Sequence, residues 1–366
     1  FKQKTAYEIP LRLVGSEMCI RDRIKKISPL APENFPKLPS VKGVLIGTAK
    51  SGTKYKGRRD IFTAIFEKGT AVAGAFTQSD IKAEPVEFCR KNIIDGSARV
   101  LAVNAGFANA FTGKKGKKIN KSISSNIKKI IKCREKDIFI CSTGVIGENI
   151  PIRPTNKAIS LSLKTEENKW ENAAKSIMTT DTFPKAAGKK IIIDNKEISL
   201  VGIAKGSGMI SPNMATMLAF IFTDALIDKT VLQTLLNIEL RNSFNAITVD
   251  GDTSTNDTVL AFATGKAMDG KNEKIISRTS DPRLKKFREA FSEIMHDLAI
   301  QIIRDGEGAS ILIQIKVSGA ENTSSAKKIA RSIADSPLVK TAVGASDPNW
   351  GRIIMAIGKA KEKINA

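Results

Sequence analysis

Residues 204–223 read AKGSGMISPNMATMLAFIFT and combine three features in one short stretch. Lys205 stands among small residues, a Ser-Pro-Asn turn signal follows, and the stretch ends in the apolar run Met217–Phe222. One interpretation is a loop that leads into a buried strand. A second interpretation also explains the small residues before the run: Thr216 is a nucleophile at the start of the strand, released as a new N-terminus when the Ala215–Thr216 bond breaks.

The segment resembles the self-cleavage site of the ornithine acetyltransferase family (bifunctional glutamate N-acetyltransferases) of arginine biosynthesis. That family carries a KG-x-GM-x-x-P-x-x-AT-ML block at the scissile bond, and this chain matches it at Lys205, Gly206, Gly208, Met209, Pro212, Ala215, Thr216, Met217 and Leu218. Further family motifs follow in the same order along the chain: GTA at 47–49, YKGR at 55–58, STGVIG at 142–147, MTTDT at 178–182, DGEGA at 305–309 and SDPNWGR at 346–352. Since these motifs extend over most of the chain, the resemblance is specific.

The resemblance implies an α/β (α+β) fold, a layered sandwich of sheets flanked by helices that processes itself. It implies cleavage into an α chain over residues 24–215 and a β chain over residues 216–366, assembled as an α2β2 heterotetramer. Residues 1–23 show no strong helix or strand period and resemble translated sequencing-adapter sequence, so we expect them to be non-native. We also expect the β chain to be C-terminally truncated, because the end at Ala366 does not resemble the family's terminal segment.

The chain is strongly basic, with 59 Lys and Arg residues against 37 Asp and Glu and a formal net charge of +22. This charge raises the alternative of a nucleic-acid-binding protein, which predicts salt-dependent binding and no self-cleavage. However, the basic residues are scattered apart from a cluster at Lys114–Lys121, and aromatic residues make up only 5%, which leaves few rings to stack on bases. A lysine-rich coding bias accounts for the charge, so we expect no nucleic-acid partner.

Hydrophobic patterning predicts a mixed α/β chain. We expect strands at residues 41–47, 61–67, 69–76, 99–105, 137–141, 191–193, 198–203, 217–223, 246–249, 259–263 and 310–317. We expect helices at residues 119–133, 165–178, 228–243, 282–304, 323–334 and 349–358. No segment has the about 18 consecutive apolar residues of a membrane span, so we expect a soluble protein with no membrane partner. The cysteines, which show no metal spacing, favour a reducing cytoplasmic setting.

Ser142-Thr143-Gly144 directly follows the strand predicted at 137–141. Acyl transfer develops negative charge on a carbonyl oxygen, and preorganised donors aimed at that oxygen are worth a few kcal/mol each. A threonine hydroxyl and a glycine amide at a strand end supply two such donors, although the same sequence also fits an ordinary strand-to-turn junction. The resemblance assigns Thr143 and Gly144 to an oxyanion hole.

Histidine is scarce in this chain. The one histidine, His296, lies roughly opposite the apolar stripe of the helix predicted at 282–304, which is typical of a solvated position. A Ser-His-Asp or Cys-His mechanism would depend on it, and Cys141, beside the 142–147 motif, has no base near it in the sequence. An N-terminal threonine carries its own base, because an α-amine has an ordinary pKa of about 8.

Metal binding has little support. The four cysteines show no metal-ligand spacing, which favours free thiols in a reducing compartment. The acidic loop 250–257, DGDTSTND, superficially resembles a calcium loop but lacks the EF-hand register and a flanking helix pair. We therefore expect no metal site.

The resemblance implies transfer of acetyl from N2-acetylornithine to glutamate through an acetyl-Thr216 intermediate. It implies substrate contacts by Thr179, Lys205, Thr216 and Glu307, in which the lysine suits a carboxylate and the glutamate suits an ammonium group. It implies no cofactor, although acetyl-CoA is a co-substrate of some family members. The alternative is a related self-processing amidohydrolase or aminopeptidase, which passes the acyl group to water.

Overall fold

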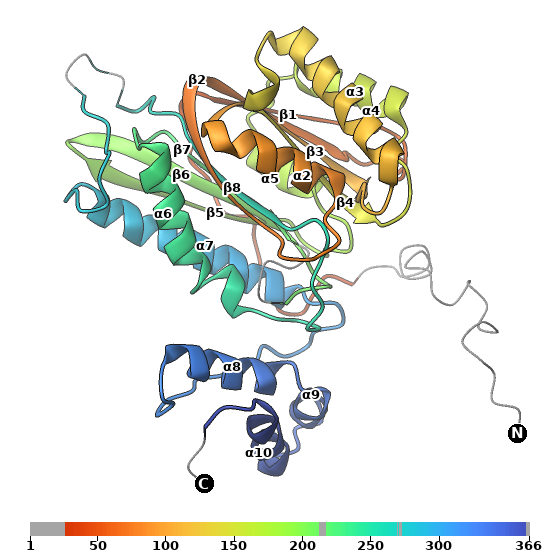
Figure 1. Cartoon of the computed structure of the whole chain (residues 1–366), viewed down its shortest axis with the longest axis vertical. Helices are drawn as coiled ribbons and strands as arrows, with labels where there is room; N and C mark the ends of the chain where they lie inside the picture. The colour runs from red at the N-terminus through yellow and green to blue at the C-terminus, as the bar shows by residue number, and fades with distance from the viewer. Residues whose placement is uncertain (1–25, 212–216, 269, 271–272, 364–366) are drawn as a thin grey trace, which may run out of the picture.

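The structure, a computed structural model, describes residues 26–211, 217–268, 270 and 273–363 (Figure 1). One sheet of eight strands has the order β4-β3-β2-β8-β7-β6-β5, with β1 paired to β2. The strands are β1 (Val44–Ala49), β2 (Ile61–Phe76), β3 (Ser97–Phe107), β4 (Ile138–Val145), β5 (Lys185–Ile193), β6 (Lys196–Lys205), β7 (Leu218–Thr223) and β8 (Thr258–Ala263). The pairs β3–β4 and β7–β8 are parallel and the other pairs are antiparallel.

Strand β2 joins two parts of this sheet. Its first half pairs with β1 and its second half, from Ala71 to Phe76, pairs with β8. Its pairing with β3 is interrupted by a bulge between Ile65 and Thr70, and bulges bend a strand and increase its twist. The expected division into separate strands at 61–67 and 69–76 is therefore wrong, because the backbone bulges there and continues in the same strand.

The two parts of the sheet pack face to face across an aromatic core. The Phe66 and Phe262 rings stack with centroids 4.3 Å apart, and the Phe62 and Phe220 centroids are 6.3 Å apart. Phe62 and Phe66 belong to the half of β2 that does not pair with β8, so these contacts join two layers. Apolar burial in this core is a main source of stability.

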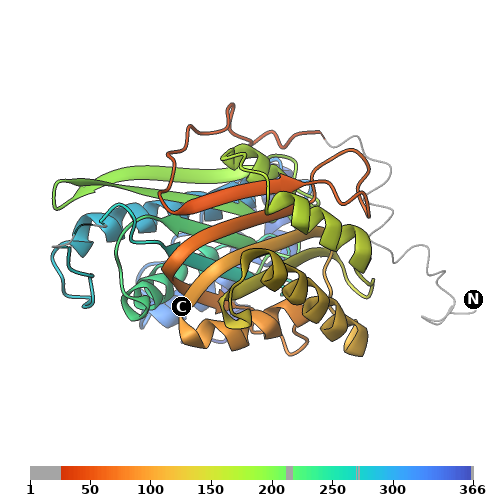
Figure 2. The same cartoon turned by 90° about the horizontal axis from the view of Figure 1, so that it is seen from above.

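The helices are α2 (Glu84–Asn92), α3 (Gly113–Ile131), α4 (Ile152–Ser162), α5 (Trp170–Ser176), α6 (Lys229–Leu240), α7 (Leu284–Arg304), α8 (Thr323–Ala334), α9 (Pro337–Gly344) and α10 (Trp350–Lys359), with short 3-10 turns η3 (Ile93–Asp95), η4 (Glu135–Asp137) and η5 (Phe244–Ala246). Helices flank the two layers of the sheet, whereas α8, α9 and α10 pack on one another in a cluster below it in Figure 1 (Figures 1 and 2). Helix α7 packs on β5 and β6, and α6 packs mainly on β2, whereas α4 packs on β1 and β2 and α3 packs on β4. The predicted α/β sandwich of sheets flanked by helices is confirmed.

Strand β7 is the apolar run of the opening stretch, and all six of its residues are buried. Phe220 and Phe222 face the aromatic core, while Ala219 and Ile221 face the cluster that contains α7. A strand buried on both faces needs a continuous apolar sequence. The expected strand at 217–223 and the expected apolar stripe of α7, with Phe287, Phe291, Ile294, Leu298 and Ile302 buried, are confirmed.

Two expected strands are wrong. Residue 246 ends the turn η5, and residues 247–249 make one backbone bond to Ile210, from the Val249 amide at 2.8 Å, so they form no strand ladder. Residues 310–317 alternate like a strand, yet Ile311 and Ile313 are 45% and 39% exposed and no described strand pairs with them. The alternating sequence at 310–317 therefore matches a strand pattern, but among the described residues it has no neighbouring strand to pair with.

The helix expected at 165–178 is shorter than predicted, since α5 spans Trp170–Ser176. The Glu167 carboxylate accepts hydrogen bonds from the Thr48 hydroxyl at 2.9 Å and from the Asn172 side chain at 3.0 Å. Glu167, which was expected in the helix, therefore lies before it and joins β1 to its first turn. Helices α2, α4 and α9 had not been expected. Across the described part of the chain, no helix is both long and apolar enough to cross a membrane.

Candidate active site

The described parts of the stretch 204–223 include the end of β6 and all of β7. Lys205 is the last residue of β6, is 2% exposed, and lies opposite Leu218, the first residue of β7. Ala215 and Thr216, the predicted cleavage position and nucleophile, lie outside the described residues. The described residue that follows them is Met217, which is buried. Lys205 therefore lies beside the start of the strand that the predicted cleavage would expose.

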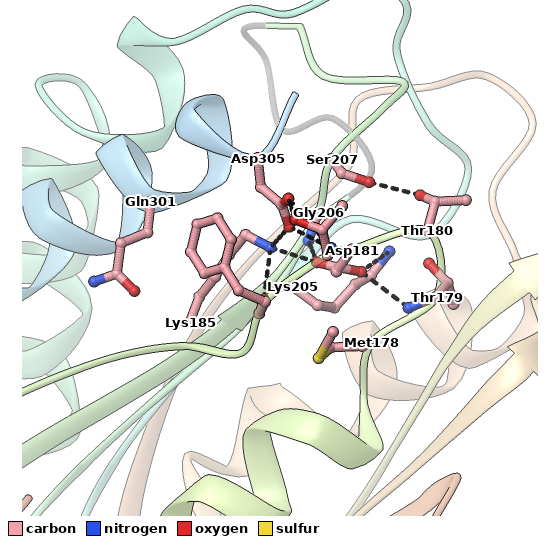
Figure 3. A network of polar contacts seen from close by, with 12 residues as sticks. Met178, Thr179, Thr180, Asp181, Lys185, Lys205, Gly206, Ser207, Gln301 and Asp305 are labelled. Atoms are coloured by element: carbon pink, nitrogen blue, oxygen red, sulfur yellow. Dashed lines mark hydrogen bonds and ion pairs between the residues drawn. The ribbon is translucent and has the colours of Figure 1, made fainter. Parts of the chain in front are cut away.

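A buried network of charges lies beside Lys205 (Figure 3). The Lys185 ammonium group at the start of β5 lies 2.7 Å from Asp181 Oδ1 and 2.5 Å from Asp305 Oδ2. All three side chains are fully buried. Asp305, the residue that follows α7, also accepts bonds from the Thr182 amide and hydroxyl. The network thus joins the end of α7, the start of β5 and the segment 178–182.

Asp181 contacts residues on both sides of the site. It accepts bonds from the Thr179 amide at 2.9 Å and the Gly206 amide at 2.6 Å, and its Oδ2 lies 3.9 Å from the Lys205 ammonium group. Burial alone would raise the pKa of Asp181, but the charges of Lys185 and Lys205 outweigh it and hold this pKa well below its usual range. Asp181 is therefore an anion that positions Thr179 and the Lys205–Gly206 turn.

Lys205 itself experiences opposing influences. Burial lowers the pKa of its ammonium group, and the negative charges of Asp181, Asp257 and Glu307 act in the opposite direction. The amide of Glu307 donates to the Ser207 carbonyl at 2.8 Å, and a Cβ built on Gly208 would lie 2.9 Å from the Glu307 carboxylate. The Glu307 side chain is exposed and its negative charge acts on the buried Lys205 ammonium group, so the segment after α7 brings a carboxylate near the end of β6.

Thr143 and Gly144 lie near the end of β4. Thr143 is 3% exposed and lies opposite Ala105 of β3, and Gly144 lies opposite Gly106. Gly144 has a φ of +132°, and a Cβ built on it would lie 2.2 Å from the Gly106 carbonyl carbon. Only glycine fits this close approach.

The loop 250–257, which precedes β8 in the chain, makes side-chain hydrogen bonds both to β4 and to the residue before β7. The Asn256 side-chain amide donates to the Ser142 carbonyl at 2.8 Å and the Ala108 carbonyl at 2.6 Å. The next residue, Asp257, accepts from the Met217 amide at 2.9 Å through Oδ1. Two successive residues thus hold the neighbour of Thr143 and the neighbour of Thr216 together. No group of metal-ligating side chains is present here or elsewhere among the residues described.

The residues of the other mechanisms do not join this site. Cys141 is buried in the aromatic core, and burial raises the pKa of its thiol well above the usual value, which disfavours a nucleophilic thiolate. His296 is exposed on α7, as the helical pattern predicted. No role was predicted for Lys185, Asn256 or Asp257, although a lysine at the start of an apolar strand is a signal for a buried ion pair.

We expect Gly144→Ala to lower the free energy of unfolding by about 3 kcal/mol or more, because the new Cβ must displace the Gly106 backbone. Urea unfolding measures this. Gly147→Ala is the matched control: Gly147 also has a positive φ, +84°, but a Cβ there meets no atom within 4 Å. Its expected loss is about 1 kcal/mol, and equal losses for both variants would contradict the close-approach account.

We expect Lys185→Met to lower the free energy of unfolding by about 3–5 kcal/mol, because it leaves two buried carboxylates without their shared cation. The matched control on the same strand is Lys190→Met. Lys190 pairs with Glu197 at 2.8 Å, but both side chains are more than half exposed, 54% and 55%, and such pairs contribute about 0–1 kcal/mol. Chemical denaturation compares the two, and a Lys185→Met loss no larger than the control would contradict the network.

The sandwich and the polar groups gathered at its strand ends define the class of protein: an α/β enzyme whose site combines buried charges with hydroxyl and amide donors at strand ends. Comparison with known proteins gives the family. The model described as the ArgJ family matches residues 45–366. The chain belongs to the ArgJ family.

Relatives named arginine biosynthesis bifunctional protein ArgJ match most of this chain. The protein from Bradyrhizobium diazoefficiens is 50% identical over 337 residues, covering 92% of this chain and 81% of the relative. That from Nitrobacter winogradskyi is 50% identical over 341 residues, covering 92% of this chain and 82% of the relative. Among solved structures, the crystal structure of ArgJ from Bacillus halodurans is similar at 29% identity with a TM-score of 0.45, covering 48% of this chain and 95% of that chain.

Proposed function

We propose that this protein transfers acetyl from N2-acetylornithine to glutamate, giving ornithine and N-acetylglutamate for arginine biosynthesis. Membership of the ArgJ family supports this reaction. The structural observation that carries it is that Glu307, which follows α7, lies near Lys205 at the end of β6, where its amide binds the Ser207 carbonyl and its charge acts on the lysine. A cation and an anion side by side suit amino-acid substrates, which bring a carboxylate and an ammonium group.

The protein first cleaves itself. The Thr216 hydroxyl oxygen attacks the Ala215 carbonyl carbon, the peptide C–N bond breaks, and the Thr216 nitrogen takes up the proton. Water then hydrolyses the resulting ester, which leaves an α chain (24–215) ending at Ala215 and a β chain (216–366) beginning at Thr216. The new α-amine, with an ordinary pKa of about 8, then serves as the base for the Thr216 hydroxyl.

Acetyl transfer follows in two half-reactions. The Thr216 oxygen attacks the acetyl carbonyl of N2-acetylornithine, the acetyl C–N bond breaks, and ornithine leaves with the proton on its α-amine. The neutral α-amine of glutamate then attacks the acetyl-threonine ester, so that the acetyl group moves to nitrogen and the hydroxyl regains its proton. Thr143 and Gly144 donate to the oxyanion in both steps, where each donor is worth about 3–4 kcal/mol.

The proposed substrate contacts are made by Thr179, Lys205, Glu307 and Thr216. Asp181 supports it, since its carboxylate binds the Thr179 amide and lies near Lys205. Glu307 also lines a cavity of about 310 Å³ near α8 and α9, which is in the range of small-ligand pockets. A bound substrate is expected to place its carboxylate toward Lys205 and its ammonium group toward Glu307.

The assembly, the cellular compartment and the absence of a cofactor are proposed together with the reaction. The two chains stay together as an α2β2 heterotetramer in the cytoplasm, and the reaction uses no bound cofactor or metal. Acetyl-CoA is an additional acetyl donor, because the same acetyl-threonine would form from its thioester with loss of the thiol. Rates of N-acetylglutamate formation with acetyl-CoA in place of N2-acetylornithine test this part.

Product analysis tests the central reaction. The purified protein is incubated with N2-acetylornithine in the presence and absence of glutamate, and the acetylated products are separated by mass spectrometry. Transfer predicts N-acetylglutamate in amounts equal to the ornithine released, and little ornithine without glutamate. Free acetate formed at the same rate with and without glutamate would show a hydrolase and contradict the proposal.

A further inference from the structure

The loop 51–60, between β1 and β2, contains the YKGR motif at 55–58, to which the proposed function gives no role. The loop is closed at its base, because the buried Asp60 carboxylate accepts from the Ser51 amide at 2.6 Å and from the Ser51 hydroxyl at 2.5 Å. These two bonds fix the points at which the loop leaves the sheet. The middle of the loop, residues 54–58, then makes contacts on two sides.

One side of the loop contacts the ends of β3 and β4. Lys54 Nζ lies 3.0 Å from the carboxylate of Glu148, which follows β4. A Cβ built on Gly106 would lie 2.8 Å from Lys54 Cβ and 3.2 Å from Tyr55 Cε2, so the absence of a side chain at Gly106 lets the Tyr55 ring lie close to the backbone there. Gly106 lies opposite Gly144 in the β3–β4 pair. Tyr55 is therefore next to the strand ends that carry the proposed oxyanion donors.

The other side of the loop contacts the segment 178–182. The Arg58 guanidinium group donates to the Met178 carbonyl, and its central carbon lies 4.0 Å from the centre of the Tyr55 ring. A guanidinium group over an aromatic face is attracted by the electrons of the ring, so Arg58 holds the ring in place. Met178 directly precedes Thr179, a proposed substrate contact. The Tyr55 ring is thus fixed between the end of β3 and the substrate-binding segment.

The Tyr55 hydroxyl makes no hydrogen bond to a residue that the structure describes, and the side chain is only partly buried. Burial raises the pKa of Tyr55 above its usual value of about 10. The charge of Arg58 acts against this shift and the charge of Asp181 adds to it. The hydroxyl therefore stays protonated at neutral pH, and it offers a hydrogen-bond donor to a ligand beside the buried charge network.

We propose that Tyr55 is a substrate-binding residue for the acetyl transfer: its hydroxyl donates to an oxygen of bound N2-acetylornithine, and its ring forms the wall between Gly144 and Thr179. The inference rests on the proposed function, because N2-acetylornithine is the ligand. Its carboxylate and acetyl oxygens both accept hydrogen bonds. A bond made equally in the bound substrate and in the transition state lowers KM without raising kcat. The family resemblance includes the motif of Tyr55 but implies no substrate contact for it.

Tyr55→Phe isolates the hydroxyl. The phenyl ring keeps its place beside Gly106 and its stacking with Arg58, and the lost hydroxyl has no bond to a described residue, so the variant is expected to be as stable as the wild type. Lys56→Ala is the matched control, because Lys56 is the next residue of the same motif and is exposed. Steady-state kinetics with both substrates varied gives KM and kcat, and urea unfolding gives the stability.

We expect Tyr55→Phe to raise KM for N2-acetylornithine by about three- to tenfold, the effect of losing one hydrogen bond to the substrate. The value of kcat is expected to change by less than about twofold. Lys56→Ala is expected to match the wild type in both constants. A role in packing alone would leave KM unchanged in Tyr55→Phe, because the ring is kept. A wild-type KM in Tyr55→Phe, or equal rises of KM in both variants, would therefore overturn the inference.

Urea unfolding separates binding from folding. Tyr55→Phe is expected to unfold at the wild-type urea midpoint, and a midpoint lower by more than about 0.5 M would show that the hydroxyl stabilises the folded protein, which would also overturn the inference. The proposed function fails in a different way. A wild-type protein that forms no N-acetylglutamate would contradict the proposed function, whereas an active wild type with an unchanged KM in Tyr55→Phe would contradict only the role of Tyr55.

Discussion

Thr216→Ala is expected to yield a single uncleaved chain that transfers no acetyl group. The substitution removes the hydroxyl that attacks both the Ala215 carbonyl and the acetyl group, so both reactions lose their nucleophile. Loss of a catalytic nucleophile typically lowers kcat by about 10⁴-fold or more. Intact mass spectrometry reports the cleavage, and N-acetylglutamate formation reports the transfer.

Thr216→Ser provides the control for this experiment. Serine keeps a hydroxyl at the same position, so the variant is expected to cleave itself and to retain measurable transfer at a reduced rate. A Thr216→Ala protein that still separates into two chains would contradict the proposed nucleophile. Cleavage lost in both variants would point to a requirement for the threonine methyl group, which the proposed chemistry does not contain.

Thr143→Val is expected to lower kcat for acetyl transfer by about 10²–10³-fold, the usual effect of removing one oxyanion donor. Valine has nearly the volume of threonine and fits a side chain that is 3% exposed, so the fold is retained. KM for N2-acetylornithine is expected to change by less than about threefold, because the donor acts on charge that develops after binding. Steady-state kinetics with both substrates varied measures the two constants.

The neighbouring hydroxyl is the matched control for Thr143→Val. The Ser142 hydroxyl donates to the Asn104 side chain at 2.6 Å inside the core, so Ser142→Ala removes a buried hydrogen bond. Its expected cost is about 1–3 kcal/mol of stability, with kcat changed by less than about threefold. A Thr143→Val variant with wild-type kcat, or equal kcat losses in both variants, would contradict the oxyanion role of Thr143.

The fold was predictable where apolar periodicity alone determines an element. The run Met217–Phe222 and the stripe of α7 are buried as expected, because each presents a continuous apolar surface that burial removes from water. The single strand β2 was not predictable, because a bulge at residues 65–70 resembles a turn in the sequence. Residues 310–317 show the converse: alternation indicates the capacity to form a strand, whereas pairing requires a neighbour that the sequence does not identify.

The candidate site was predictable only through the family resemblance. The resemblance identified the motifs that contain Thr143, Gly144, Thr179, Lys205 and Glu307. The local pattern offered donors at Thr143 and Gly144, but it fitted an ordinary strand-to-turn junction equally well. The buried contacts that support them are long-range: Lys185 and Asp305 are 120 positions apart in the chain. Asp257 binds an amide 40 positions away. Polar residues in loops have no periodicity, so such contacts become visible only in three dimensions.

The most direct test of the account is the intact mass of the purified wild-type protein, combined with N-terminal sequencing of every chain present. Self-cleavage at the Ala215–Thr216 bond predicts two chains, one of which begins Thr-Met-Leu-Ala-Phe, the sequence of residues 216–220. A single uncleaved chain that nevertheless transfers acetyl to glutamate, or cleavage at any other bond, would contradict the central claim that Thr216 becomes an N-terminal nucleophile.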